Sequence, residues 1–239
     1  VVTPPFSRFI VVVDGWLVMC GGMTGCGYKT TVNTVSGINV YSSYEEKIPG
    51  RFALVVDSQP ELLTKKVKAS SFTCSAHNFP VALSNTFESS IYEATKSIFE
   101  EVATRVTIPS KEEMSKDELS GYILVKATHF EPKVTFIPGF FSGNVSTSAD
   151  IGFEFSVRDR ENKLILSSAV SASRSSDGEA GGACEGGATS LSEAISKAFR
   201  EALERYAERV SNSTKLREAF APPLLKQADV PQAARIIKK

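Results

Sequence analysis

The chain has 239 residues, of which 42% are hydrophobic and 23% are charged, as in typical globular proteins. Its 27 basic and 27 acidic residues balance, which excludes a global electrostatic attraction to nucleic acid or to anionic lipid. After residue 25 no stretch approaches the roughly 18 uninterrupted apolar residues of a membrane span. We therefore expect any attachment to a membrane to come from a lipid anchor.

The first 26 residues have the features of a secretory leader. Arg8 precedes the apolar residues 9–13 (FIVVV) and 16–19 (WLVM), and small residues surround Cys26. The sequence Met23-Thr24-Gly25-Cys26 also resembles a bacterial lipobox, in which the cysteine becomes the lipidated first residue of the mature protein. This resemblance predicts a signal peptide over residues 1–25 and lipidation of Cys26. The alternative is that residues 9–13 form a buried N-terminal strand.

The segment after Cys26 is polar and small, which predicts a tether over residues 26–37 between the anchor and the folded body. Residues 38–41 and 52–57 (FALVVD) have the composition of strands, with Pro49-Gly50 as the turn between them. Residues 67–74 (VKASSFTC) alternate between apolar and polar and predict a third strand.

The hydrophobic period then changes to steps of three and four, which predicts an amphipathic helix. Its apolar positions are Leu83, Phe87, Ile91, Ala94, Ile98, Val102 and Val106. Pro80 lies at its entry and Pro109 ends it. The charged residues 111–118 are predicted to form a solvated linker.

A second block of strands follows. Residues 122–136 predict a strand in which Pro132 indicates a bulge or an edge position. Residues 148–158 and 163–173 alternate around a polar turn at 159–162, which predicts an antiparallel hairpin.

A glycine-rich loop over residues 178–187 leads into the longest predicted helix. Ser190 and Glu193 have the spacing of a capping box at its start. One apolar stripe then continues over residues 191–210. Residues 216–239 contain three prolines and few large apolar side chains, so we expect a flexible C-terminal tail.

This order of strands, helix, strands and helix predicts an α+β fold, with a mostly antiparallel sheet and two long helices packed on one face. Residues 38–215 would form its single domain. Cys74 and Cys184 each precede a short loop and one of the two helices, so helices lying side by side would bring them together. In an oxidising compartment they would then form a disulfide. The alternative is two unrelated buried thiols.

The lipobox-like Cys26, the polar spacer and this order of elements resemble small envelope lipoproteins of the YajG type and auxiliary lipoproteins of envelope ABC transporters. The likeness is strongest from Ala149-Asp150-Ile151, through the turn at Asn162-Lys163, to the helix pattern over residues 192–198. It implies a non-catalytic accessory or assembly factor of an envelope transport complex, attached to the periplasmic face of the outer membrane. Gly27, in place of Asp, fits the outer membrane under this resemblance.

Two other roles remain open in the same compartment. One is a lipoprotein regulator of a peptidoglycan synthase or of a secretion or flagellar complex. The other is a periplasmic thiol enzyme in which Cys74 acts with His77, although no third group that would orient the histidine is evident. A disulfide at Cys74 and catalysis by its thiol exclude each other in the resting protein.

The sequence favours neither a cofactor nor a metal. The glycine-rich loop precedes a helix as a P-loop does, but it has Ala188 where a P-loop has lysine, and Glu179 and Glu185 would repel a phosphate. Cys74 and His77 have the spacing of half a zinc site without a second close pair. His129 lies within a predicted strand and is interpreted as a half-buried packing residue.

The aromatic loop over residues 136–141 (FIPGFF) is the most exposed-looking apolar cluster. Three aromatic side chains in a loop with proline and glycine indicate either a segment folded into the core or a contact patch for a protein partner. In the second case Phe136, Phe140 and Phe141 would bind the partner.

Overall fold

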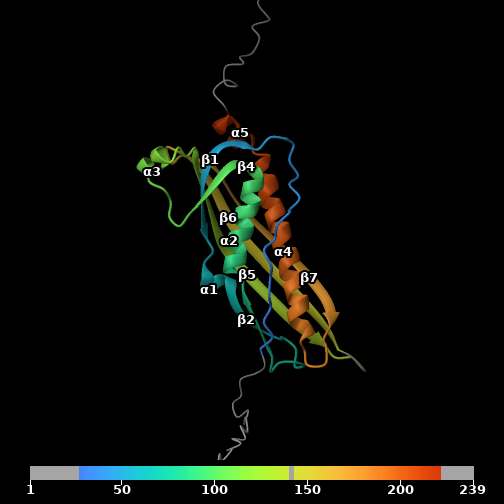
Figure 1. Ribbon diagram of the computed structural model, residues 1–239. Helices are drawn as coiled ribbons and strands as arrows, with labels where there is room; N and C mark the ends of the chain where they lie inside the picture. Colours follow the sequence, from blue (N-terminus) through green and yellow to red (C-terminus); the bar gives the residue numbers. More distant parts are fainter. Residues whose placement is uncertain (1–26, 140–142, 222–239) are drawn as a thin grey trace, which may run out of the picture.

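The protein is an α+β domain built on a five-stranded sheet, in a computed structural model that describes residues 27–139 and 143–221. The order of the strands in the sheet is β4-β1-β5-β6-β7. They are β1 (Ile48–Asp57), β4 (Phe99–Arg105), β5 (Gly121–Ile137), β6 (Asn144–Asp159) and β7 (Leu164–Glu179). The helices α2 (Ser84–Ile98) and α4 (Gly186–Ser211) lie side by side on one face (Figure 1). The predicted fold class is therefore confirmed.

The sheet has a long antiparallel part and a shorter parallel part. β5, β6 and β7 pair antiparallel over almost their full lengths, whereas β1 pairs parallel with both β4 and β5. Parallel neighbours need a crossover connection, and α2 supplies it between β1 and β4. The predicted hairpin of residues 148–158 and 163–173 is confirmed as the central part of β6 and β7.

Pro132 lies in β5 beyond the residues that pair with β1, which end at Lys126. This is the edge position that the proline predicted. The irregularity in the pairing of β5 with β6 lies elsewhere, between Ala127 and His129.

The predicted helix over residues 83–106 is too long. α2 ends at Ile98, and β4 begins at the next residue. Phe99 and Val102 continue the helical spacing, but their side chains also suit a strand. Pairing with β1 decides between the two structures, so these residues form β4 and do not continue α2. Pro80, predicted at the helix entry, lies in β3 (Asn78–Ala82), which pairs antiparallel with β2 (Thr64–Lys68).

Several shorter predictions are also wrong. Pro49-Gly50 lies inside β1, where the pairing register with β4 shifts, and residues 38–41 are not a strand. The third predicted strand ends as β2 at Lys68, before a loop. The sequence reasoning also missed the short helix α1 (Pro60–Leu63).

Two segments predicted without structure contain helices. α3 (Lys111–Lys116) begins with a capping box between Ser110 and Glu113, and its Met114 packs on the second face of the sheet. α5 (Thr214–Phe220) buries Leu216 and places its terminal aromatic ring against Phe52, so the predicted flexible tail does not begin at residue 216. Residues 222–239 lie outside the described residues.

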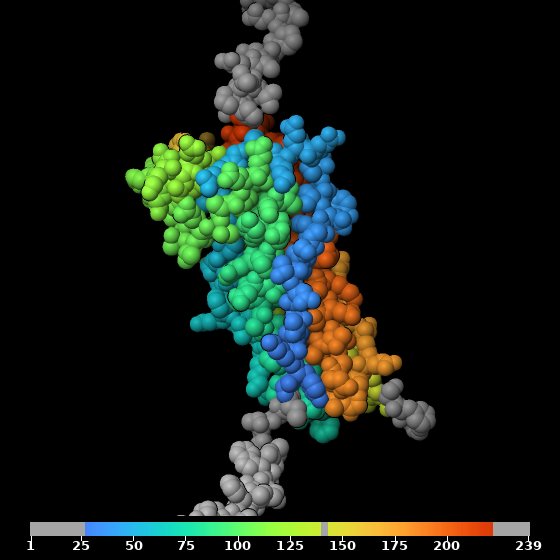
Figure 2. Space-filling view, in the orientation of Figure 1, coloured from blue at the N-terminus to red at the C-terminus, as the bar shows by residue number. Residues whose placement is uncertain are grey.

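We call residues 27–47 the N-terminal strap, and its first part, residues 27–37, runs along the groove between α2 and α4 (Figure 2). Val32 and Val35 are buried there. The backbone N–H of Val35 donates to Ser90 Oγ of α2 at 2.9 Å, and the Ser192 hydroxyl of α4 donates to the Thr31 carbonyl at 2.5 Å. The part predicted as a tether, from residue 27 to 37, is thus packed against the domain and is not a free spacer.

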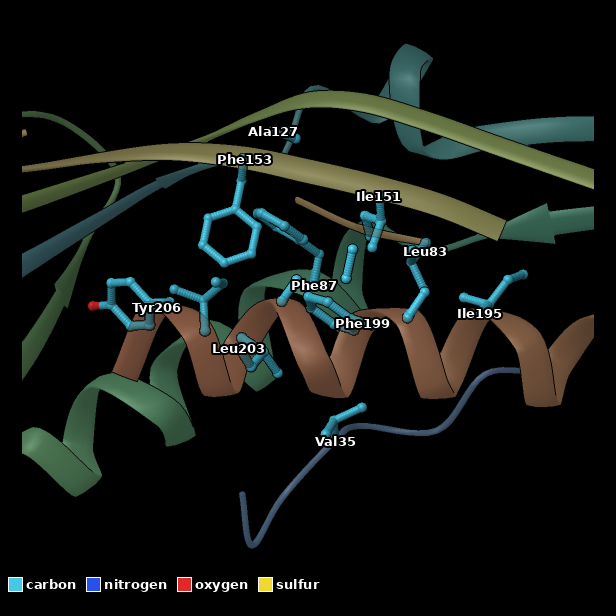
Figure 3. Close-up of a cluster of buried hydrophobic side chains, with 14 of the residues drawn as sticks. Val35, Leu83, Phe87, Ala127, Ile151, Phe153, Ile195, Phe199, Leu203 and Tyr206 are labelled. Atoms are coloured by element: carbon cyan, nitrogen blue, oxygen red, sulfur yellow. The ribbon is translucent and has the colours of Figure 1, made fainter. Parts of the chain in front are cut away.

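Aromatic side chains fill the core between the sheet and the two helices (Figure 3). Phe87 of α2 stacks on Phe199 of α4 with 5.6 Å between ring centroids, and meets Phe153 of β6 edge-on at 5.7 Å. Tyr206 of α4 is fully buried, and its hydroxyl lies 2.9 Å from Thr95 Oγ1 of α2. This hydrogen bond joins the two helices within the apolar core.

Candidate functional site

The predicted site residues that the structure describes gather at one end of the domain. We call this the disulfide end, and it comprises residues 27–30, 69–79, 134–139 and 179–187. Gly27, the first described residue, pairs there with Asn78 at the start of β3. Helix α5 lies at the opposite end of the domain (Figure 1).

A disulfide joins the two loops of this end. The sulfur atoms of Cys74 and Cys184 are 1.99 Å apart, and their Cα atoms are 6.1 Å apart. The predicted pairing is confirmed. Both cysteines have left-handed backbone conformations, with φ of 63° at Cys74 and 69° at Cys184.

Hydrogen bonds fix the loop of residues 69–77 to the end of β5. The backbone N–H of Ser70 donates to the Val134 carbonyl at 2.8 Å. The backbone N–H of Phe136 donates to Ser71 Oγ at 2.9 Å. Together with the disulfide, these bonds hold the 69–77 loop at its start and at its middle.

Tyr28 ties the start of the strap to both cysteine loops. Its hydroxyl donates to the Ala183 carbonyl at 2.5 Å, and its ring centroid lies 5.4 Å from that of His77. Its backbone N–H donates to the Asn78 carbonyl at 2.8 Å. The chain is therefore fixed to the disulfide end two residues after Cys26, which itself lies outside the described residues.

The aromatic loop divides between the core and the surface. Phe136 is only 2% exposed and packs against Phe79, with 5.9 Å between ring centroids, so its predicted role in partner binding is wrong. Alternation along β5 turns the next side chain outward, and Ile137 is 52% exposed. Phe140 and Phe141 lie outside the described residues.

Phe72 is the most exposed large apolar side chain of the disulfide end, at 97% exposure. This exposure differs from the prediction, because the alternation of residues 67–74 predicts a strand that buries every second side chain. The signal that could have found it is Ser70-Ser71, since neighbouring serines favour a turn whose side chains bond to the backbone.

In the glycine-rich loop, the side-chain carboxylate of Glu185 accepts a hydrogen bond from a backbone N–H group of the same loop. Glu185 Oε2 accepts a hydrogen bond from the backbone N–H of Ala183 at 2.9 Å. Bonds from the N–H of Glu185 itself and from Ala183 lower the pKa of this carboxyl. The N–H groups that would hold a phosphate in a P-loop therefore already bind an anion. The predicted capping box of Ser190 and Glu193 is absent from α4, which begins at Gly186 and so contains both residues.

The residues considered for thiol and metal chemistry are not arranged for it in the described structure. Cys74 has its sulfur bonded to Cys184 and offers no thiolate. No group of three or more His, Cys, Asp and Glu side chains within residues 27–139 and 143–221 is placed to hold a metal ion. His129 lies over Gly152 of β6 and its Nε2 is 2.7 Å from Asp150 Oδ1, with both side chains partly exposed.

No helix of the described structure combines the length and the apolar character needed to cross a bilayer.

No protein-family model matches the chain, and neither does any curated protein sequence. Solved structures that match the chain include a protein from Helicobacter pylori described as a neuraminyllactose-binding hemagglutinin homolog. That match has 12% identity, a TM-score of 0.38, and covers 79% of this chain and 96% of the other. A minor lipoprotein from Acinetobacter baumannii matches with 10% identity and a TM-score of 0.29, over 66% of this chain and 87% of its own. A lipoprotein from Neisseria meningitidis matches with 10% identity and a TM-score of 0.28, over 63% of this chain and 99% of its own.

Proposed function

We propose that the protein is a bacterial envelope lipoprotein, anchored through Cys26 to the periplasmic face of the outer membrane. The observation that carries this proposal is the lipobox-like Met23-Thr24-Gly25-Cys26, followed at once by a folded domain that begins at Gly27. The disulfide between Cys74 and Cys184 supports an oxidising compartment. The absence of Asp after Cys26 favours the outer membrane, as the lipobox resemblance implies.

Lipidation would provide stable attachment without a membrane-spanning helix. Each buried CH₂ contributes about 0.8 kcal/mol, so a single acyl chain binds reversibly whereas two or more hold a protein on the membrane. The strap is packed along the domain, so attachment at Cys26 would hold the folded body close to the lipid surface.

The role on the membrane would be non-catalytic binding, as an accessory or assembly factor of an envelope transport complex. We assign this contact to the face of β6 and β7 opposite the helices, which is partly exposed and polar and includes Ser148, Asp150, Glu154 and Ser173. Capture of a peptidoglycan synthase or of secretion or flagellar components would favour the alternative role as their regulator.

The anchor is tested by replacing Cys26 with serine in the full chain. We expect the wild-type mature protein to begin at Cys26, to carry the mass of attached acyl chains and to fractionate with outer membranes. The Cys26→Ser variant should remain uncleaved or become soluble in the periplasm. Unchanged fractionation, with no lipid mass on the wild-type protein, would contradict the proposal.

The role is tested by cross-linking and pull-down from detergent-solubilised envelopes. The Cys26→Ser variant serves as the control that keeps the folded domain but lacks the anchor. Components of a transport complex should be captured by the wild-type protein and lost with the variant.

A further inference from the structure

Two large apolar side chains of the disulfide end are exposed among the residues that the structure describes. Phe72 is 97% exposed and Ile137 is 52% exposed. Single exposed apolar residues are common on protein surfaces, so exposure alone does not define a site. Their position and the rigidity of their supports are what distinguish them.

The backbone that carries Phe72 is fixed to the domain. Ser71 Oγ, on the preceding residue, accepts the backbone N–H of Phe136 at 2.9 Å, and Cys74 is bonded to Cys184 two residues later. Ile137 follows Phe136 directly in β5. The two exposed side chains therefore come from neighbouring segments that are hydrogen-bonded to each other, and both lie at the same end of the domain.

The start of the described chain lies at this same end. Gly27 pairs with Asn78, which is the residue that follows the 69–77 loop. Cys26 is one residue before Gly27, and one residue spans at most about 3.8 Å between Cα atoms. Acyl chains on Cys26 would thus enter the lipid beside Phe72 and Ile137.

We propose that Phe72 and Ile137 insert into the lipid surface that holds the Cys26 acyl chains, and so fix which end of the domain faces the membrane. This inference rests on the proposed lipid anchor. Two side chains bind a membrane weakly alone, but the anchor keeps them at a high effective concentration at its surface. The charged side chains of this end are Lys29, Glu179 and Glu185, which include both signs. They give no strong electrostatic attraction to a lipid surface, so we expect the binding of Phe72 and Ile137 to the membrane to be apolar and independent of salt.

A single-tryptophan variant tests this contact. Trp16 is the only tryptophan of the chain and lies in the predicted signal peptide, so Phe72→Trp places a unique fluorophore in the processed protein. The lipidated variant is reconstituted in phosphatidylcholine vesicles with and without brominated acyl chains, which quench tryptophan inside the bilayer. Leu164→Trp is the matched control, because Leu164 is 47% exposed at the opposite end of the sheet.

We expect brominated lipid to lower the fluorescence of Phe72→Trp at least roughly twofold, at low and at high salt, since an apolar side chain in the interface lies at the acyl boundary. The fluorescence of Leu164→Trp should stay unchanged. Equal fluorescence of Phe72→Trp in both kinds of vesicle would overturn the inference.

The same samples separate this inference from the proposed anchor. Mass spectrometry and flotation show whether the protein carries lipid and binds the vesicles. A protein without lipid overturns the anchor and this inference together. A lipidated, vesicle-bound Phe72→Trp protein whose introduced tryptophan is not quenched overturns only the inference, and loss of a protein partner with Phe72→Ser would then assign the side chain to a protein contact.

Discussion

Gly187 lies at the start of α4, where the helix passes directly over two aromatic rings of the core. A Cβ atom at this position would lie 2.7 Å from Phe79 Cε1 and 2.8 Å from Phe136 Cζ. Both rings are buried and cannot swing into solvent. Glycine is therefore required at residue 187 by close packing and not by its backbone angles.

We predict that Gly187→Ala lowers the free energy of unfolding by about 1–3 kcal/mol, because overpacking forces the rings or the helix to shift. Gly182→Ala is the matched control in the same loop, since nothing lies within 4 Å of a Cβ atom there. Urea denaturation of both variants checks the prediction. Equal stability of the two would show that the core accommodates the extra methyl group.

The two hydroxyls of the buried hydrogen bond between Tyr206 and Thr95 differ in whether they keep a partner when the other residue is replaced. Thr95 Oγ1 also donates to the Ile91 carbonyl at 2.7 Å, so its hydroxyl keeps a partner when Tyr206 is changed to phenylalanine. Tyr206→Phe should lower the free energy of unfolding by about 1 kcal/mol. Thr95→Val should lower it by up to about 3 kcal/mol, because this variant leaves the tyrosine hydroxyl buried without a partner. Chemical denaturation measures both, and the reverse order would contradict this account.

Burial also makes Tyr206 a source of pH dependence. Desolvation raises its pKa well above the usual value of 10.0, and the hydrogen bond to Thr95 only partly opposes this. In the unfolded chain the tyrosine loses its proton near pH 10, while in the native protein it keeps it. The resulting stabilisation is complete below pH 10 and is lost as the pH rises further, by about 1.4 kcal/mol per pH unit.

We therefore predict that the unfolding free energy of the wild-type protein falls more steeply between pH 10 and 11 than that of Tyr206→Phe. Equilibrium denaturation at matched pH values gives the difference between the two proteins. This difference removes the effect of the other tyrosines and of the lysines. Parallel pH profiles would mean that Tyr206 ionises without unfolding.

At the scale of elements, the disulfide joins two loops through left-handed residues. A disulfide that closes a separation of 110 residues stabilises by about 5 kcal/mol in the chain-entropy model. A left-handed conformation costs a residue with a side chain about 1–2 kcal/mol, and glycine avoids this cost. Replacing the cysteines therefore has two separable effects on stability, the loss of the cross-link and the change in the cost of the left-handed backbone.

The double variant Cys74→Ala/Cys184→Ala should lose several kcal/mol of unfolding free energy. Cys74→Gly/Cys184→Gly should be more stable than the alanine pair by about 1 kcal/mol per position, because both positions have positive φ. Thermal and guanidinium unfolding of the two pairs check this order. A less stable glycine pair would show that the loops change conformation once the cross-link is removed.

The edge strand β7 is protected by arginine side chains from α4. Arg209 Nη1 donates to the Ala169 carbonyl at 2.5 Å, and Arg205 donates to the Ser171 carbonyl. An edge strand with free carbonyls offers a template for pairing with another chain. These arginines occupy part of that template.

We predict that Arg205→Ala/Arg209→Ala increases self-association, with a loss of unfolding free energy within about 1 kcal/mol because the contacts are exposed. Lys111→Ala/Lys116→Ala, which removes two positive charges from exposed positions of α3, is the control. Light scattering after size-exclusion chromatography distinguishes the two. Association of both variants alike would indicate a charge effect and not exposure of the edge.

The sequence predicted the elements whose hydrophobic period matches their burial. The hairpin of β6 and β7 and the helix α4 belong to this group. The pairing of Cys74 with Cys184 was predicted in another way, from the position of each cysteine before one of the two helices. The prediction was wrong where one spacing suits two structures, as at Phe99, and where burial depends on distant segments. Phe136 is in the core because Phe79 and Gly187 cover it, and a single-sequence pattern contains no information about that contact.

For the whole molecule, the N-terminal strap determines how far the folded body can move from Cys26. Val32 and Val35 are buried between the helices, and the backbone on either side of Lys29 is hydrogen-bonded to β3. An attached strap therefore protects Lys29 from proteases, although the side chain is exposed.

We predict that Val32→Asp/Val35→Asp releases the strap and accelerates cleavage by trypsin after Lys29 at least roughly tenfold, since buried charges without partners strongly destabilise the packed state. Asn33→Asp/Ser36→Asp places the same charges on exposed positions of the strap and should leave the rate unchanged. Mass spectrometry of the fragments measures the rates. Rapid cleavage of the wild-type protein would show that the strap opens on its own.

The course of the strap has a mechanical consequence. Gly27 and α5 lie at opposite ends, and the strap extends from one end towards the other (Figure 1). A pull between an anchored Cys26 and the far end would load the strap along its own length, in shear. Its bonds, from Tyr28 with Asn78 to Tyr41 with Asn212, would then resist sliding together and would not open one at a time. An anchored strap would therefore transmit tension from one end of the domain towards the other through bonds that share the load.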